Sequence, residues 1–120
     1  KYGKIISTSS MYGKVANINA TEVSYHASKA GVIGLTKALG SEWAKYNITV
    51  NSIAPGYFAT EILTECLKDE AFVDWIGRRS PMRRMGNMEE LDGAVIFLAS
   101  DASRYITGHT LSVDGGWTAV

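Results

Sequence analysis

Three short runs of β-branched and apolar residues, separated by much longer helical patterns, constrain the fold of this 120-residue chain most strongly. The runs lie at 5–8, 48–54 and 110–113, and small or turn-forming residues follow each one. Strands joined by long helical connections pair in parallel, because each connection returns the chain to the same end of the sheet. The pattern therefore predicts an α/β fold with parallel strands and right-handed crossovers.

The stretches between these runs are typical of helices. The first helix is expected over roughly 22–46, where apolar and small residues give a broad packing surface, and Thr21 or a neighbour would cap its start. The second is expected over 60–79 and the third over 88–100, each with apolar side chains at helical spacing.

Composition and charge exclude several classes of protein. Apolar residues make up 46% of the chain, which suits a packed core and argues against disorder. The formal net charge is +0, so no basic field points to nucleic acid or to an anionic membrane. No apolar run is long enough to span a bilayer, and no signal-peptide pattern begins the sequence. No linker divides residues 1–120, which indicates one domain or part of one.

The single cysteine and the first residue carry two further expectations. Cys66 cannot form an internal disulfide and lacks the companions of a cysteine-rich metal site, so we expect a reducing, cytoplasmic setting and no metal. Lys1 begins the chain without an initiator methionine, which suggests a segment of a longer protein or a processed product.

Tyr25 and Lys29 are the first candidates for chemistry. They are four residues apart on the expected first helix, so both face the same side. An ammonium beside a phenol favours its ionised form, and such a tyrosine can exchange a proton with a hydroxyl near neutral pH. The same spacing is also typical of a solvated helix face, so the pair by itself identifies no function.

The ends of the first two strands carry further candidates. Ser9 and Ser10 follow the first strand, and ligands of open α/β sheets bind beyond the carboxyl ends of the strands. Pro55 should end the middle strand, and Gly56 permits close approach of the backbone to a flat ligand. Thr60 follows at an expected helix start, where its hydroxyl and free N–H groups could bind a polar group. Ordinary polar strand ends and turns explain each feature equally well.

Six motifs in a fixed order go beyond these single features. They are Ser-Ser-x-x-Gly at 9–13, Ser-Tyr-x-Ala-Ser-Lys-Ala-Gly at 24–31, Val-Asn-Ser-Ile-Ala-Pro-Gly at 50–56, Pro-x-x-Arg-x-Gly-x-x-Glu-Glu at 81–90, Phe-Leu-Ala-Ser at 97–100 and Thr-Gly-x-x-Leu-x-Val-Asp-Gly-Gly at 107–116. Together they resemble the short-chain dehydrogenase/reductase family over essentially the whole chain. The resemblance implies the C-terminal half of a Rossmann-like, doubly wound parallel sheet, with 1–120 a single partial domain without the family's glycine-rich dinucleotide turn.

The resemblance implies a catalytic trio. Tyr25 would be the general acid/base, Lys29 would favour the ionised phenol, and Ser10 would hydrogen-bond the substrate carbonyl or alkoxide. The spacing from Ser10 to Tyr25 is two residues longer than in many members, which implies an enlarged loop. Ser9 is the alternative if that insertion shifts the register.

The resemblance also implies a cofactor, NAD or NADP, and reversible hydride transfer between it and a secondary alcohol or ketone. Tyr25 and Lys29 would hold its nicotinamide ribose, Pro55 and Gly56 would border the nicotinamide, and Thr60 would bind the carboxamide. The residues that choose between NAD and NADP belong to the family's early strands, so the choice stays open and the segment alone is expected to be inactive.

Three strings resemble the sugar-acid branch of the family, which includes gluconate 5-dehydrogenases and deoxy-ketogluconate dehydrogenases. They are Glu42-Trp43-Ala44-Lys45, Pro55-Gly56-Tyr57-x-Ala-Thr and Asp114-Gly115-Gly116-Trp117. The implied small-molecule substrate is a sugar acid or polyol such as gluconate, and 3-oxoacyl-carrier-protein reduction is the alternative. Residues 57–79 would form a substrate lid, and four arginines would either attract a carboxylate or form a solvated connector: Arg78, Arg79, Arg83 and Arg84.

Two hypotheses from other classes stand beside the enzyme. Small residues on the expected first helix suit close helix packing, and the family resemblance implies a homo-oligomer, a dimer or tetramer. A shortened, non-catalytic interaction protein that pairs with full-length subunits would need that surface alone, and a nucleotide-binding module without chemistry is the third hypothesis. Neither needs Ser10, Tyr25 and Lys29 together, so the trio favours the enzyme.

Overall fold

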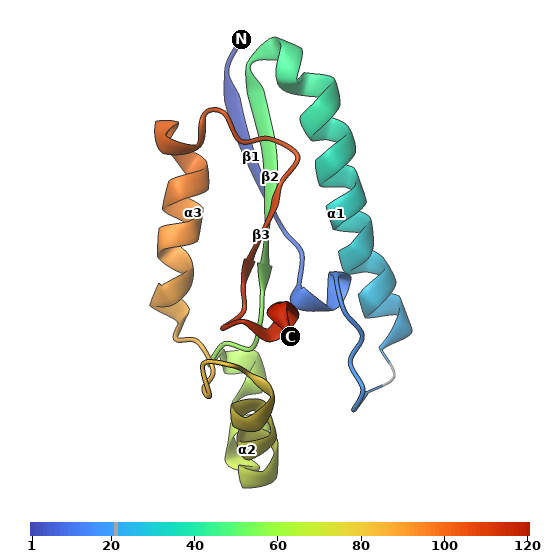
Figure 1. Ribbon diagram of the computed structural model, residues 1–120, viewed down its shortest axis with the longest axis vertical. Coiled ribbons are helices and arrows are strands. Elements are labelled where there is room, and N and C mark those ends of the chain that lie inside the picture. The colour runs from blue at the N-terminus through green and yellow to red at the C-terminus, as the bar shows by residue number, and fades with distance from the viewer. Residues whose placement is uncertain (21) are drawn as a thin grey trace.

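The computed structural model describes residues 1–20 and 22–120, which contain a single three-stranded sheet (Figure 1). β1 (Gly3–Thr8) pairs with β2 (Ile48–Pro55), and β2 pairs with β3 (Thr110–Val113). Both pairings are parallel, so the predicted α/β fold is confirmed. Thr21, named above as a cap of the first helix, lies outside the described residues.

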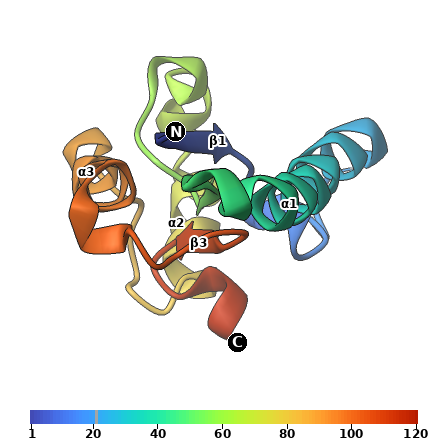
Figure 2. The ribbon, with the colours of Figure 1, turned by 90° about the horizontal axis from the view of Figure 1, so that it is seen from above.

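β2 is the buried centre of the sheet. Its residues from Val50 to Ala54 are at most 5% exposed, whereas β1 and β3 are only partly covered. A strand buried on both sides needs a layer on each face of the sheet. α1 (Val23–Trp43) covers one face and α3 (Asp92–Ala99) covers the other (Figure 2).

One of the two helical connections differs from the expectation in its handedness. The strands follow the chain order β1, β2, β3, but α1 and α3 lie on opposite faces of the sheet (Figure 2). Parallel crossovers that move in one direction along a sheet and pass over opposite faces have opposite hands. The prediction that both are right-handed is therefore wrong for one of them, although that hand is strongly preferred in general.

The second predicted helix is shorter than expected. α2 spans only Glu70–Arg79, and the preceding residues form two separate 3₁₀ turns, Glu61–Leu63 and Cys66–Lys68. The carboxylate of Asp69 accepts the N–H groups at the start of α2, which makes Asp69 its N-cap. Across residues 1–20 and 22–120, no helix combines the length and the apolar character needed to cross a membrane.

A small hydrophobic cluster lies beyond the carboxyl ends of the strands. Met11 and Tyr12, from the 3₁₀ turn after β1, pack with Ile76 of α2 and Trp117 near the C-terminus, and all four are at most 6% exposed. The cluster joins three segments that are far apart in the sequence. It therefore fixes the loop after β1 relative to α2 and the C-terminal turn.

Candidate active site

An open groove of about 700 Å³ lies at the carboxyl ends of the strands. Its walls come from the loop after β1, the first turns of α1, the residues after β2 and the segment leading to α2. All six residues singled out from the sequence line this one groove: Ser10, Tyr25, Lys29, Pro55, Gly56 and Thr60. The fold therefore brings together side chains from three separate motifs.

The two neighbouring serines make different hydrogen bonds. Ser9 Oγ donates to the main-chain oxygen of Lys29 at 2.8 Å, so its proton is already used. Ser10 Oγ accepts the N–H of Tyr12 at 3.1 Å and acts as the N-cap of the 3₁₀ turn. A hydroxyl that only accepts keeps its proton for another acceptor. This geometry favours Ser10 over Ser9 as the donor to a bound oxygen.

Tyr25 and Lys29 occupy successive turns at the start of α1. The Tyr25 side chain is 42% exposed, and Lys29 Nζ lies 5.6 Å from the centre of its ring. Lys29 Nζ also donates to the main-chain oxygen of Thr8, at the end of β1, at 3.2 Å. The ammonium is thus held between the sheet and the phenol ring, where its charge stabilises negative charge near the tyrosine.

The loop after β1 is pressed against the helix that carries this pair. A Cβ atom added to Gly13 would lie 2.8 Å from the carbonyl carbon and oxygen of Lys29. The bond from Ser9 Oγ to that same oxygen closes the contact. The position of Ser10 relative to Lys29 therefore depends on a close backbone approach that only glycine permits.

The end of β2 differs slightly from the prediction. Pro55 belongs to the strand and stands opposite Val113 of β3, because the missing N–H matters little at the last residue of a ladder. Gly56 N–H continues the pairing by donating to the Val113 oxygen at 2.9 Å. A Cβ on Gly56 would lie 2.8 Å from Asp114 Cα, so the two strand ends touch there.

Thr60 lies in the groove, but it does not cap a helix. It precedes the 3₁₀ turn Glu61–Leu63 and makes no capping hydrogen bond with its side chain. The expected helix start at Thr60 is wrong, because the helix itself begins ten residues later, after Asp69. Among the described residues the Thr60 hydroxyl makes no hydrogen bond, so it is open to a ligand in the groove.

Tyr12 and Tyr57 also line the groove. Sequence reasoning named Tyr57 only within the string Pro55-Gly56-Tyr57-x-Ala-Thr and at the start of the expected lid, and it did not name Tyr12 as a site residue. Their hydroxyl oxygens lie 3.1 Å apart, at hydrogen-bond distance. Burial is the largest cause that raises the pKa of each phenol above its ordinary value, so both stay protonated. The signals in the sequence were their positions, two residues after Ser10 and one after Gly56, and the place of Tyr57 in the sugar-acid string.

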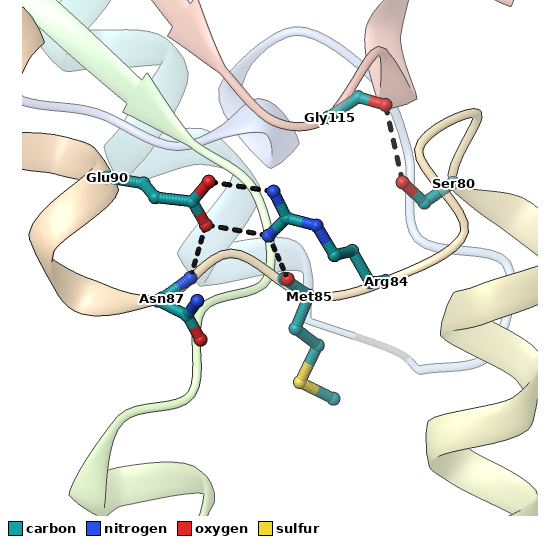
Figure 3. Close-up of polar contacts among 6 residues, drawn as sticks. All are labelled: Ser80, Arg84, Met85, Asn87, Glu90 and Gly115. Atoms are coloured by element: carbon teal, nitrogen blue, oxygen red, sulfur yellow. Dashed lines mark hydrogen bonds and ion pairs between the residues drawn. The ribbon is translucent and has the colours of Figure 1, made fainter.

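None of the four arginines proposed to attract a carboxylate lines the groove within the described part of the chain. Arg78 pairs with Asp74 at 2.9 Å, and the guanidinium of Arg79 lies 5.0 Å from the centre of the Trp117 ring. Arg84 forms a two-pronged pair with Glu90 at 2.6 and 2.7 Å (Figure 3). The structure therefore favours structural roles for these three side chains.

The Arg84–Glu90 pair organises the connector between α2 and α3. Glu90 also accepts the N–H of Asn87, and Arg84 donates to the Met85 oxygen (Figure 3). The bond from Arg84, and then the one from Asn87, lowers the pKa of Glu90 from 4.5 to about 2. Together these contacts close the loop at the start of the 3₁₀ turn Met88–Leu91.

The groove carries groups that could hold the nicotinamide end of a dinucleotide. It offers an ammonium at Lys29, an open hydroxyl at Thr60 and a closely packed glycine backbone at Gly56. Within residues 1–20 and 22–120, no group of three histidine, cysteine, aspartate or glutamate side chains is arranged to hold a metal ion. The groups present can therefore bind a ribose hydroxyl and an amide.

Comparisons with known proteins give matches over nearly the whole chain. Residues 1–118 match the protein family described as Enoyl-(Acyl carrier protein) reductase. The 2-dehydro-3-deoxy-D-gluconate 5-dehydrogenase of Escherichia coli (strain K12) is 47% identical over 117 residues, which cover 98% of this chain and 46% of that relative. The gluconate 5-dehydrogenase of Gluconobacter oxydans (strain 621H) is 41% identical over 116 residues, which cover 97% of this chain and 44% of that relative.

A solved structure gives the same result for the fold. A gluconate 5-dehydrogenase from Burkholderia cenocepacia J2315, in complex with NADP and tartrate, matches with a TM-score of 0.94 and 45% identity. The match covers 99% of this chain and 46% of that one. The chain thus spans less than half the length of the relatives it matches.

Proposed function

The chain belongs to the short-chain dehydrogenase/reductase family, as its motifs predicted, and on that basis we propose that its protein is an NAD- or NADP-dependent oxidoreductase. It interconverts a secondary alcohol and a ketone by hydride transfer. Residues 1–120 form the C-terminal, catalytic half of its Rossmann-like domain. The observation that carries this proposal is the meeting of Ser10, Tyr25 and Lys29 in one groove.

The three side chains divide the work at the substrate oxygen. A bound nicotinamide cofactor supplies the hydride to the carbonyl carbon, or accepts it in the reverse direction. Tyr25 donates its phenolic proton to the carbonyl oxygen as the alcohol forms and takes it back in the reverse direction. Lys29 stabilises the phenolate that remains, and Ser10 donates a hydrogen bond to the same oxygen.

In this proposal Tyr25 and Lys29 would hold the nicotinamide ribose. Pro55 and Gly56 would border the nicotinamide, and Thr60 would bind its carboxamide. The support is their position in the groove: the ammonium of Lys29 is aimed at the end of β1, and Gly56 lies flat against the neighbouring strand end.

The proposed substrate is a sugar acid or polyol. Support comes from the relatives, which are named for gluconate and deoxygluconate, and from the amide side chains of Asn17 and Asn19 in the groove, which can bind hydroxyl groups. Reduction of a 3-oxoacyl-carrier-protein is the second candidate, because the matching family is described as a carrier-protein reductase. Turnover of 5-keto-D-gluconate compared with a 3-oxoacyl thioester separates the two.

Tyr25→Phe in the full-length protein tests the mechanism. Loss of the phenolic proton donor is expected to lower turnover by about 10²-fold or more, because a positioned acid/base contributes rates of this size. Binding of NADPH and NADH, followed by fluorescence, should stay close to that of the unmodified protein. Normal turnover in this variant would refute the acid/base assignment.

We also propose a homo-oligomer in the cytoplasm. No described residue lies within 4 Å of where a Cβ would be on Gly31 or Gly34, and Leu35 beside them is 55% exposed, so α1 presents a flat face to a second copy. Light scattering of the full-length protein measures the assembly, and a monomer there would contradict it. The exposed thiol of Cys66 supports a reducing compartment, which cell fractionation checks.

A further inference from the structure

We propose that Tyr12 and Tyr57 form a hydroxyl-recognition pair, which makes the groove prefer polyhydroxylated substrates over simple ketones. The inference rests on the proposed function and assigns its substrate selection to two named side chains. Tyr57 belongs to a string that resembles the sugar-acid branch, whereas Tyr12 stands at an unspecified position of its motif. The pair joins two loops that are far apart in the sequence.

The position of the pair links it to the proposed reaction. Tyr12 donates its main-chain N–H to Ser10 Oγ at 3.1 Å, and Tyr57 directly follows Gly56. Both side chains line the groove that holds Tyr25. A substrate whose carbonyl oxygen lies between Ser10 and Tyr25 would therefore extend its neighbouring carbons along the two tyrosines.

The two phenols have one O–H proton that is free to bind a substrate hydroxyl. Two phenols carry two O–H groups, and the bond between their oxygens uses only one of them. Among the described residues neither hydroxyl has another hydrogen-bond partner. One proton and the unused lone pairs are therefore available to a substrate hydroxyl, which itself both donates and accepts. Burial keeps both phenols neutral, so the pair can donate but does not act as a base.

The pair is rigid before any ligand arrives. The Tyr57 ring makes edge-on contacts with Phe72, Trp75 and Trp117, with ring centres 5.4–6.1 Å apart. The Tyr12 ring lies 5.3 Å from His26. A donor held in place loses little freedom on binding, which favours selectivity. Phe72 and Trp75 also line the groove and offer apolar surface to the C–H groups of a polyol.

The surrounding charges fit hydroxyl groups better than a second anion. Glu22 raises the pKa of both phenols, Tyr25 and Cys66 raise that of Tyr57 further, and Arg79 lowers that of Tyr12. In the described part of the chain, Glu22 and Lys29 are the charged side chains that line the groove. Lys29 lies at the end of the groove that holds Tyr25. Near Tyr12 and Tyr57, Glu22 can therefore accept a hydrogen bond from a substrate hydroxyl but would repel a carboxylate.

The test uses Tyr57→Phe and Tyr12→Phe in the full-length protein, since phenylalanine keeps the ring and removes only the hydroxyl. Each variant is assayed with 5-keto-D-gluconate and with 2-hexanone, a ketone without hydroxyl groups. We expect kcat/KM for 5-keto-D-gluconate to fall about 10-fold, mainly through KM, because one hydrogen bond is lost and its partner is left unpaired. The value for 2-hexanone should change less than about twofold.

Tyr105→Phe is the matched control, because Tyr105 is fully exposed and lies outside the groove. It should leave both substrates unaffected. Equal losses with both ketones in the tyrosine variants would show a structural role for the pair and overturn the proposal, as would unchanged kinetics with both.

A binding measurement separates this inference from the proposed function. Titration calorimetry of D-gluconate into the NADP-loaded protein should show about 10-fold weaker binding in Tyr57→Phe, whether or not hydride is transferred. Unchanged gluconate affinity overturns the recognition pair. Undiminished turnover in Tyr25→Phe instead overturns the proposed function and leaves the binding result to decide the inference.

Discussion

Ser9 and Ser10 show how the same residue type takes two roles at the scale of single side chains. The Ser9 hydroxyl donates its proton to the main-chain oxygen of Lys29, whereas the Ser10 hydroxyl accepts the main-chain N–H of Tyr12. Both are at most 6% exposed, so burial does not distinguish them. The two serines differ in whether the hydroxyl donates or accepts its hydrogen bond. That difference depends on how the loop after β1 lies against α1.

Gly13 is the residue that sets this contact, and its substitution is the prediction at this scale. Gly13→Ala places a Cβ 2.8 Å from the backbone of Lys29, which cannot move away without shifting α1. We expect a loss of about 1–3 kcal/mol in the free energy of unfolding, because overpacked contacts cost this much, together with lower turnover. Urea denaturation and kinetics of the full-length protein measure both.

Gly93→Ala is the control for that variant. Gly93 lies in helix α3, outside the groove, and no described residue is within 4 Å of its added Cβ. The helix should gain roughly 0.5–1 kcal/mol from this substitution, because alanine has the higher helix propensity. Equal stability of the two variants would contradict the close approach of Gly13.

At the scale of elements, boundaries were less predictable than the elements themselves. The apolar spacing over 60–79 predicted one helix, but only Glu70–Arg79 is helical. Asp69 starts the helix by accepting two N–H groups, and the residues before it form turns along the groove. Periodicity records which side chains face the core, and two turns can satisfy that requirement as well as one helix.

The connector between α2 and α3 should make stability depend on pH. The pKa of Glu90 falls from 4.5 to about 2 in the folded chain, so its contribution is complete above about pH 4.5 and is lost as the pH falls toward 2. Glu90→Gln should therefore unfold more easily than the unmodified protein at about pH 6 but not at about pH 2.

Thermal denaturation across this pH range measures the effect. Glu89→Gln is the control, because in the described structure Glu89 forms no ion pair. The Arg84–Glu90 pair is partly exposed to solvent, which limits its contribution to stability. Its two-pronged geometry is the arrangement in which an exposed ion pair contributes most. A constant difference between Glu90→Gln and the unmodified protein at every pH would contradict the assigned pairing.

At the scale of the whole molecule, the chain is longer and thinner than a compact domain. Its radius of gyration is 15.5 Å, against about 14 Å for a typical domain of this length. Its extents are 50 × 28 × 26 Å, and α2 extends beyond the end of the sheet (Figure 1). Apolar side chains on α3 are exposed as well, such as Ile96 at 65%. Several large apolar side chains are thus uncovered in the 120-residue segment.

The sheet edge supplies the prediction at this scale. Among the described residues β1 pairs on one side only, and an unpaired edge recruits other strands. We expect the 120-residue segment, expressed alone, to self-associate, and Ile5→Lys on β1 to reduce this more than Ile18→Lys in the following loop. Light scattering over a range of concentrations measures it, and a monomeric segment, or equal effects of the two lysines, would contradict edge pairing.

The sequence by itself determined the strand and helix order, the parallel pairing, the family and six of the residues that line the groove. Each of these follows from local signals in the sequence. The signals are strand-type and helix-type hydrophobic patterns that follow one another, turn residues at strand ends, and motifs that each lie within one short segment. Parallel strands carry their ends to one edge, so candidates at strand ends were bound to meet there.

Tertiary structure alone decided the hand of the crossovers, the start of α2, the choice between Ser9 and Ser10 and the pairing of Tyr12 with Tyr57. Each depends on contacts between segments far apart in the chain, such as the 3.1 Å approach of two hydroxyls 45 residues apart. No local pattern encodes such a distance, because it results from how the loops pack once the sheet and its helices are in place.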